Sequence, residues 1–199
     1  MICRCFCSKS ETADSHDLPA TSIVKAQNFE KDNDPRIQLT QKQIYVLTKN
    51  WKGIDRKVCE AGVEMFLKLL SLHPEYYKMF PFHRIATSSD EKKRMDECLR
   101  AHGETVMKSL GQAISNIGNS EKFFELIDQI GRSHAHKKYF KPELFWLMEE
   151  PFLYSLKLIL GERCTDNMHS IYKTVITIIL SEMEKGCESE MRGMQKVED

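Results

Sequence analysis

Residues 89–118, SDEKKRMDECLRAHGETVMKSLGQAISNIG, decide the fold class of this chain. Apolar side chains recur along them at the three- and four-residue steps of a helix that buries one face. These side chains are Met95, Leu99, Val106, Leu110, Ala113 and Ile117. A serine or aspartate within residues 88–90 can cap the start of such a helix, and Gly118 and Asn119 can close its end. The pattern predicts one long amphipathic helix, with His102 beside its apolar stripe.

Similar periodicity predicts helices elsewhere in the chain, and no alternating strand pattern competes with it. The expected helices cover residues 40–54, 58–70, 120–134, 141–160 and 165–186, with a short helical turn from Pro74 to Phe80. Thr40 can cap the first of these helices, while Gly161 and Gly186 can end the last two. Residues 81–90 are expected to form a loop. The chain is therefore predicted to be an all-α domain of about seven helices.

Composition limits the classes of function and suggests the domain boundaries. The 199 residues carry 29 Lys and Arg against 29 Asp and Glu, so no basic excess favours a nucleic acid as partner. Residues 1–39 are polar with few apolar side chains and predict a flexible N-terminal extension. We expect the folded domain to cover residues 40–186 and a polar C-terminal tail to follow over residues 187–199.

The cysteines and the apolar content of the chain indicate the cellular compartment of the protein. Seven cysteines form an odd set with no repeating spacing, which favours a reducing environment. The N-terminus has no apolar signal region, and the longest late aliphatic stretch, residues 175–180, is far below the roughly 18 residues that span a bilayer. These observations predict a cytoplasmic protein.

Two histidines carry the candidate chemistry. His134 follows Leu126 and Ile130 at steps of four and so lies on the apolar face of its helix, as His102 does on its own. Either histidine alone is most simply an ordinary helix residue. Two of them on separate amphipathic helices suit a planar macrocycle, because neutral imidazole is a good iron ligand and apolar walls would bury the ring. His136, two positions further on, would point elsewhere.

The chain resembles the globin family over residues 40–186. Its markers are Trp51 in LTKNWKGI, Pro74 and Phe80 in HPEYYKMF, His102 and Val106 in RAHGETV, and His134 in IGRSH, eight residues before Pro142 of KPELF. The 32 positions between His102 and His134 are most similar to neuroglobin-type and nematode-like intracellular globins. The resemblance implies a globin fold, a three-over-three sandwich of roughly seven to eight helices around heme. Gly62 and Gly103 would then permit close contact between two crossing helices.

The resemblance also implies the roles of individual residues. His134 corresponds to the proximal ligand of heme b iron, and His102 to a distal residue that either binds the iron or donates a hydrogen bond to a bound ligand. Further heme contacts are expected from Phe66, Phe80, Val106, Lys138 and Phe140. Lys138 would pair with a heme propionate, although it can equally be a solvated lysine. The relatives suggest a bis-histidyl, hexacoordinate heme at rest, and the two histidines are equally compatible with a pentacoordinate heme.

Three functions remain open from the sequence. The first is reversible binding of O2, CO, NO or a similar small ligand, for storage, transport or sensing. The second is redox chemistry at the heme, which would require an external electron donor because no flavin or nicotinamide fingerprint occurs. The third is a heme-free helical adaptor. No catalytic residue set is evident, so we expect a binding protein rather than an enzyme, with weak heme redox activity as the alternative.

Two local features depart from the simplest globin pattern. Pro151 lies inside a predicted helix, where proline removes a hydrogen bond, and so predicts a kink or a displaced helix start near Glu149 and Glu150. Three cysteines alternate at the N-terminus, at Cys3, Cys5 and Cys7. They are candidates for S-acylation and membrane association, or else form a metal-binding or merely disordered end.

Overall fold

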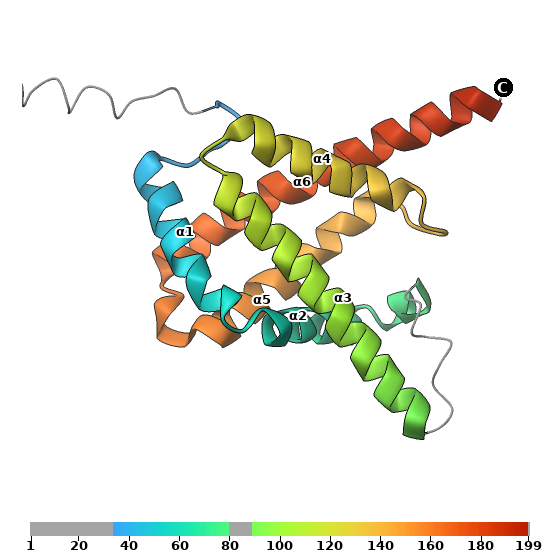
Figure 1. Ribbon diagram of the computed structural model, residues 1–199, viewed down its shortest axis with the longest axis horizontal. Coiled ribbons are helices and arrows are strands. Elements are labelled where there is room, and N and C mark those ends of the chain that lie inside the picture. The colour runs from blue at the N-terminus through green and yellow to red at the C-terminus, as the bar shows by residue number, and fades with distance from the viewer. Residues whose placement is uncertain (1–33, 80–88, 199) are drawn as a thin grey trace, which may run out of the picture. The chain divides into compact units, whose positions relative to one another are not determined.

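The computed structural model describes residues 34–79 and 89–198 and leaves residues 1–33, 80–88 and 199 outside the description. This described part contains six α-helices, three 3-10 helices and no strand (Figure 1). The α-helices are α1 (Gln41–Asp55), α2 (Val58–Leu72), α3 (Ser89–Asn116), α4 (Ser120–Ala135), α5 (Glu149–Leu160) and α6 (Asp166–Glu198). The 3-10 helices are η2 (Pro74–Met79), η4 (Pro142–Met148) and η5 (Gly161–Arg163). The predicted all-α class is confirmed.

Helix α1 begins where the sequence predicts. The Thr40 side chain accepts a hydrogen bond from the Gln43 backbone N–H at 3.2 Å, and the Gln43 side chain accepts one from the Thr40 N–H at 2.8 Å. This reciprocal capping box satisfies two backbone donors that a helix start otherwise leaves unpaired. The buried face of α1 carries Trp51, which stacks on Phe152 with ring centroids 6.3 Å apart.

Two glycines set the crossing of α2 and α3, the pair that brings His102 into place. A Cβ atom added to Gly103 would lie 2.7 Å from the carbonyl carbon of Gly62, and one added to Gly62 would overlap the Gly103 backbone. Backbone atoms cannot move aside as the end of a side chain can, so only glycine fits at either position. The predicted close contact is confirmed, and it places His102 immediately beside the crossing point.

Pro151 displaces a helix start, as the sequence suggests. The predicted helix over residues 141–160 divides into η4 and α5, and Pro151 is the third residue of α5. Proline is tolerated in the first turn because its missing N–H would have no intrahelical partner there. Gly161 ends α5 with a positive φ of 54°, a conformation that glycine adopts without strain.

The predicted end of the last helix at Gly186 is wrong, because α6 continues to Glu198. Gly186 instead lies where α6 meets α4: an added Cβ would be 2.8 Å from the Asp128 carbonyl oxygen. Gly131 on α4 makes the reciprocal approach, and its added Cβ would lie 2.8 Å from the Cα of Met183. Residues beyond 186 are therefore helical rather than a frayed tail, and Cys187 is fully buried. Figure 1 shows α4 running beside α6 and the last turns of α6 projecting past the other helices.

The segment before α1 is also more ordered than predicted. Ile37 and Leu39 are buried in the core, and the Arg36 guanidinium lies 3.7 Å from the centroid of the Phe124 ring. The flexible extension predicted for residues 1–39 is thus wrong for residues 34–39, because alternate apolar side chains of an extended segment pack against the helices. The predicted loop at residues 81–90 is wrong at its end, since α3 begins at Ser89. Residues 1–33 and 81–88 lie outside the described residues.

Within the described residues, none of the helices combines the length and apolar character that crossing a membrane requires.

Candidate functional site

His134 occupies the last turn of α4 with its ring held in one orientation. Its Nδ1 lies 2.8 Å from the carbonyl oxygen of Ile130, four residues earlier, and 3.4 Å from the Ser133 hydroxyl oxygen. A carbonyl oxygen only accepts, so Nδ1 carries the proton and donates it, which leaves a lone pair on Nε2. Nε2 has no hydrogen-bond partner among the described residues. This is the arrangement of a metal-ligating histidine, whose other ring nitrogen is fixed by an acceptor.

Two phenylalanines flank the His134 ring. The centroids of Phe140 and Phe145 each lie 4.9 Å from that of His134, and they lie 4.8 Å from each other in an edge-to-face contact. Phe145 is buried and Phe140 half-buried. Because the three rings pack mutually, the imidazole is restrained by contact as well as by its hydrogen bond.

His102 lies on α3 with the buried Phe66 of α2 beside it, the ring centroids being 4.9 Å apart. Part of the His102 surface is open to solvent, and protein atoms surround the rest of the residue. Burial is the largest cause that lowers the pKa of His102 below 6.5, and repulsion from His134 and Lys137 lowers it further. His134 therefore lies close enough to His102 to affect the charge of that imidazole.

Both imidazoles are held in their neutral form. Burial lowers the pKa of His134 below 6.5; the hydrogen bond to Ile130 opposes that shift, and Lys137 adds to it. A lowered pKa keeps each ring unprotonated at neutral pH, which is the form that binds a metal. Two neutral imidazoles on α3 and α4, with Phe66, Phe140 and Phe145 around them, form the candidate site.

The other predicted site residues are placed as follows. Val106 is half-buried on α3, one turn after His102. Lys138 is exposed, with its ammonium nitrogen 4.8 Å from the centroid of the Tyr139 ring, so its described contact is with a neighbouring side chain. His136 is exposed and lies 3.4 Å from a Glu190 carboxylate oxygen, so its described contact is with α6 and not with His102 or His134. Phe80 and the three cysteines Cys3, Cys5 and Cys7 lie outside the described residues.

Sequence reasoning missed two participants. These are Phe145, which packs on the His134 ring, and the Ile130 carbonyl oxygen, which accepts from His134 Nδ1. A histidine late in a helix can donate to the carbonyl four residues earlier, so the spacing between Ile130 and His134 contained a usable signal. The role of Phe145 depends on the irregular chain between α4 and η4, which periodicity does not describe.

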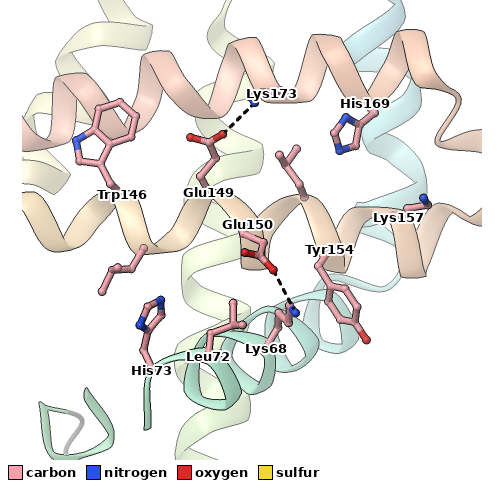
Figure 2. A pocket seen from close by; sticks show the side chains of 12 residues that line it. Lys68, Leu72, His73, Trp146, Glu149, Glu150, Tyr154, Lys157, His169 and Lys173 are labelled. Atoms are coloured by element: carbon pink, nitrogen blue, oxygen red, sulfur yellow. Dashed lines mark ion pairs between the residues drawn. The ribbon is translucent and has the colours of Figure 1, made fainter. Parts of the chain in front are cut away.

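A surface groove of about 590 Å³ lies elsewhere, along α2, η4, α5 and α6. Figure 2 shows its paired charges: Lys68 with Glu150 at 3.2 Å and Lys173 with Glu149 at 3.7 Å. Neither His102 nor His134 lines this groove. Each acid in the groove is matched by a lysine, and the groove shares no lining residue with the histidine site.

A comparison with protein families decides what kind of domain this is. The family model described as Globin matches residues 63–183, more than half of the chain and both histidines. The chain belongs to the globin family. Among similar globins, neuroglobin of Tetraodon nigroviridis is 23% identical over 149 residues, which cover 75% of this chain and 92% of that protein. Cytoglobin-1 of Danio rerio is 24% identical over 110 residues, covering 55% of this globin and 63% of that protein.

A solved structure extends the similarity to three dimensions. The hexacoordinated heme protein from an anhydrobiotic tardigrade, crystallised at pH 4, matches this globin with a TM-score of 0.68 and 29% identity. The match covers 78% of this chain and 99% of the tardigrade protein. It supports the globin architecture over the whole of the compared domain.

The residues at the site fit a heme group. A porphyrin supplies four nitrogen ligands of its own, so the protein needs to add only one or two axial ligands. His134 has the hydrogen bond, tautomer and available Nε2 of such a ligand. In the described part of the chain, no cluster of three or more His, Cys, Asp or Glu side chains forms an alternative metal site.

Proposed function

We propose that this globin binds heme b between α3 and α4, with His134 as the proximal ligand of the iron and His102 as a distal ligand that small diatomic molecules displace. The observation that carries the proposal is the fixed His134 ring, whose Nδ1 donates to Ile130 while Nε2 remains available. When bound, heme iron supplies reversible coordination of O2, CO, NO or a similar ligand.

The distal residues decide how the site responds to a ligand. His102 is neutral, lies beside Phe66 and carries a partly open surface, so it can move without dismantling the buried core. Bound to iron, it would make the resting state bis-histidyl, and it would lower the apparent affinity for an external ligand by the fraction of sites it occupies. Displaced, its remaining N–H would donate a hydrogen bond to the incoming ligand. Phe66 and Val106 would limit the access of water.

We further propose oxygen binding, storage or sensing in the cytoplasm as the role, with heme redox chemistry as the alternative. The four cysteines in the described residues, Cys59, Cys98, Cys164 and Cys187, are all free thiols, which accords with a reducing compartment. Lys138 remains a proposed partner for a heme propionate.

Heme titration of three single variants tests the proposal. Wild-type protein should bind one heme per chain, and His134→Ala should lose tight binding because it removes the imidazole that the Ile130 carbonyl holds in place. His136→Ala is the matched control, since this exposed histidine lies two residues further along the same segment. His102→Leu should retain heme while losing the distal ligand. Equal heme binding by His134→Ala and His136→Ala would refute the assignment, and no heme uptake by the wild type would refute the function.

A further inference from the structure

The far part of α6 contacts both elements that surround His134. On α4, Arg132 donates through Nη1 to a Glu190 carboxylate oxygen at 3.2 Å and through Nε to Asp128 at 2.6 Å. His136 lies 3.4 Å from the other oxygen of Glu190. Arg132 and His136, which lie two residues before and two residues after His134, therefore contact the same carboxylate of α6, that of Glu190.

A second contact joins α6 to η4. The indole N–H of Trp146 donates to a Glu184 carboxylate oxygen at 2.8 Å. Trp146 directly follows Phe145, whose ring packs edge-to-face on His134. Glu184 thus holds η4, the segment that packs Phe145 against the imidazole. Glu190 holds the end of α4, which carries His134.

Both contacts rest on a close helix crossing. Gly131 and Gly186 allow the backbones of α4 and α6 to approach until no Cβ fits between them. Because this approach is fixed by backbone contact, the α6 carboxylates stand at a set distance from the last turn of α4. The helix that extends beyond the predicted end at Gly186 supplies Glu190.

We propose that α6 positions the proximal ligand: Glu190, acting through Arg132, and Glu184, acting through Trp146, are positioning residues for the His134 imidazole. This inference rests on the proposed heme function and adds to it a role for α6 in setting the orientation of the iron ligand. Neither glutamate touches the imidazole itself.

The expected effect is modest, because the side chains of Arg132 and Glu190 are only partly buried, with 42% and 31% of their surfaces exposed. Ion pairs of this kind contribute little individually. Glu190→Gln should therefore speed heme loss about twofold to fivefold. The effect should shrink at high salt, since screening weakens partly exposed ion pairs.

The chain provides a matched control in Glu188. This residue pairs with Arg192 at 3.8 Å within α6 and lies two positions from Glu190, so Glu188→Gln removes the same charge from the same helix. Heme transfer to an excess of apomyoglobin would give the loss rates of wild type, Glu190→Gln, Glu188→Gln, Arg132→Gln and the Glu190→Gln/Arg132→Gln double variant. The double variant should speed heme loss by less than the product of the two single-variant effects, because the contact between Arg132 and Glu190 is broken in both single variants.

Two readouts separate positioning from general stability. Electron paramagnetic resonance of the ferric protein reports the orientation of the axial imidazoles, and its g-values should shift in Glu190→Gln and Glu184→Gln but not in Glu188→Gln. Hydrogen exchange of the heme-free protein should be faster over residues 133–137 in Glu190→Gln and in Arg132→Gln, but not in Glu188→Gln. Identical g-values, heme-loss rates and exchange in Glu190→Gln and Glu188→Gln would overturn the inference. A protein that takes up no heme but shows the exchange difference would refute the proposed function while retaining the contact between α6 and α4.

Discussion

Replacing Gly131 with alanine should destabilise the protein, although the same change is favourable in most helices. An alanine in a helix interior is about 1 kcal/mol more favourable than a glycine. At Gly131, however, the added Cβ would lie 2.8 Å from the Cα and 2.9 Å from the carbonyl carbon of Met183 on α6. Relieving that overlap requires α4 and α6 to separate, and overpacking of this kind costs about 1–3 kcal/mol.

Gly193 provides the opposite case within the same structure. It also lies inside α6, but an added Cβ would have no atom within 4 Å. Gly193→Ala should therefore leave stability unchanged or raise it by up to about 1 kcal/mol. Set against the gain of about 1 kcal/mol, the overlap leaves Gly131→Ala with a net loss of up to about 2 kcal/mol. A loss of that size would lower Tm by about 4–8 °C for a chain of this size.

Thermal and urea unfolding of the heme-free variants, followed by circular dichroism, measures both changes without a contribution from heme binding. Heme reconstitution then shows whether separating α4 from α6 weakens the site. If Gly131→Ala proved as stable as Gly193→Ala, the close crossing of α4 and α6 would be wrong, and with it the positioning of His134 by α6.

Three further changes test other parts of the structure. Thr40→Ala removes the capping box of α1 and should lower the free energy of unfolding by about 0.5–2 kcal/mol in urea titrations; an unchanged midpoint would contradict the cap. Tyr172→Phe removes the hydrogen bond of 2.8 Å from the buried phenol to Asn50 and should lower the free energy of unfolding by about 0.5–1.5 kcal/mol in the same assay. Hydrogen bonds from Arg36 lower the pKa of Asp34 from 3.8 to about 2, so Asp34 stabilises the fold above pH 3.8 and loses that effect as pH falls through 2. Titration of the Asp34 carboxyl by NMR should show this lowered midpoint, which returns toward 3.8 in Arg36→Gln; a midpoint already near 3.8 in the wild type would rule out the pairing.

Much of the fold follows from local sequence because helices depend on residues that are near in sequence. The apolar stripe on α3, the cap at Thr40 and the break at Gly161 are each determined within one or two turns. The crossing at Gly62 and Gly103 was also predictable, but only through the family resemblance, because the two glycines are 41 positions apart. Local sequence patterns identify the individual helices, whereas predicting which helices contact each other required the family resemblance.

The errors occur where one residue type serves two purposes. Gly186 suits a helix end, and it equally suits a helix interior that a neighbouring backbone approaches. Only the position of Asp128 across the crossing distinguishes the two. Ile37 and Leu39 were likewise missed because an extended segment of a few residues carries no helical period, and its burial depends on helices that lie far along the chain.

The candidate histidine site, too, could be predicted only in part from the sequence. The two histidines could be found from their spacing and their apolar surroundings. Their neutral state depends chiefly on burial, and the effect of His134 on the pKa of His102 depends on how α3 and α4 pack; neither can be read from the sequence. The contact of Phe145 with His134 follows from the turn between α4 and η4, where Tyr139 adopts a positive φ of 68° that no local pattern indicated.

The absorption spectrum of the ferrous protein without external ligand tests the central claim most directly. If His134 and His102 both bind the iron, the visible bands of the wild type should be sharp and split, and His102→Leu should replace them with a single broad band while retaining heme. A single broad band in the wild type, or an unchanged split spectrum in His102→Leu, would contradict the bis-histidyl site.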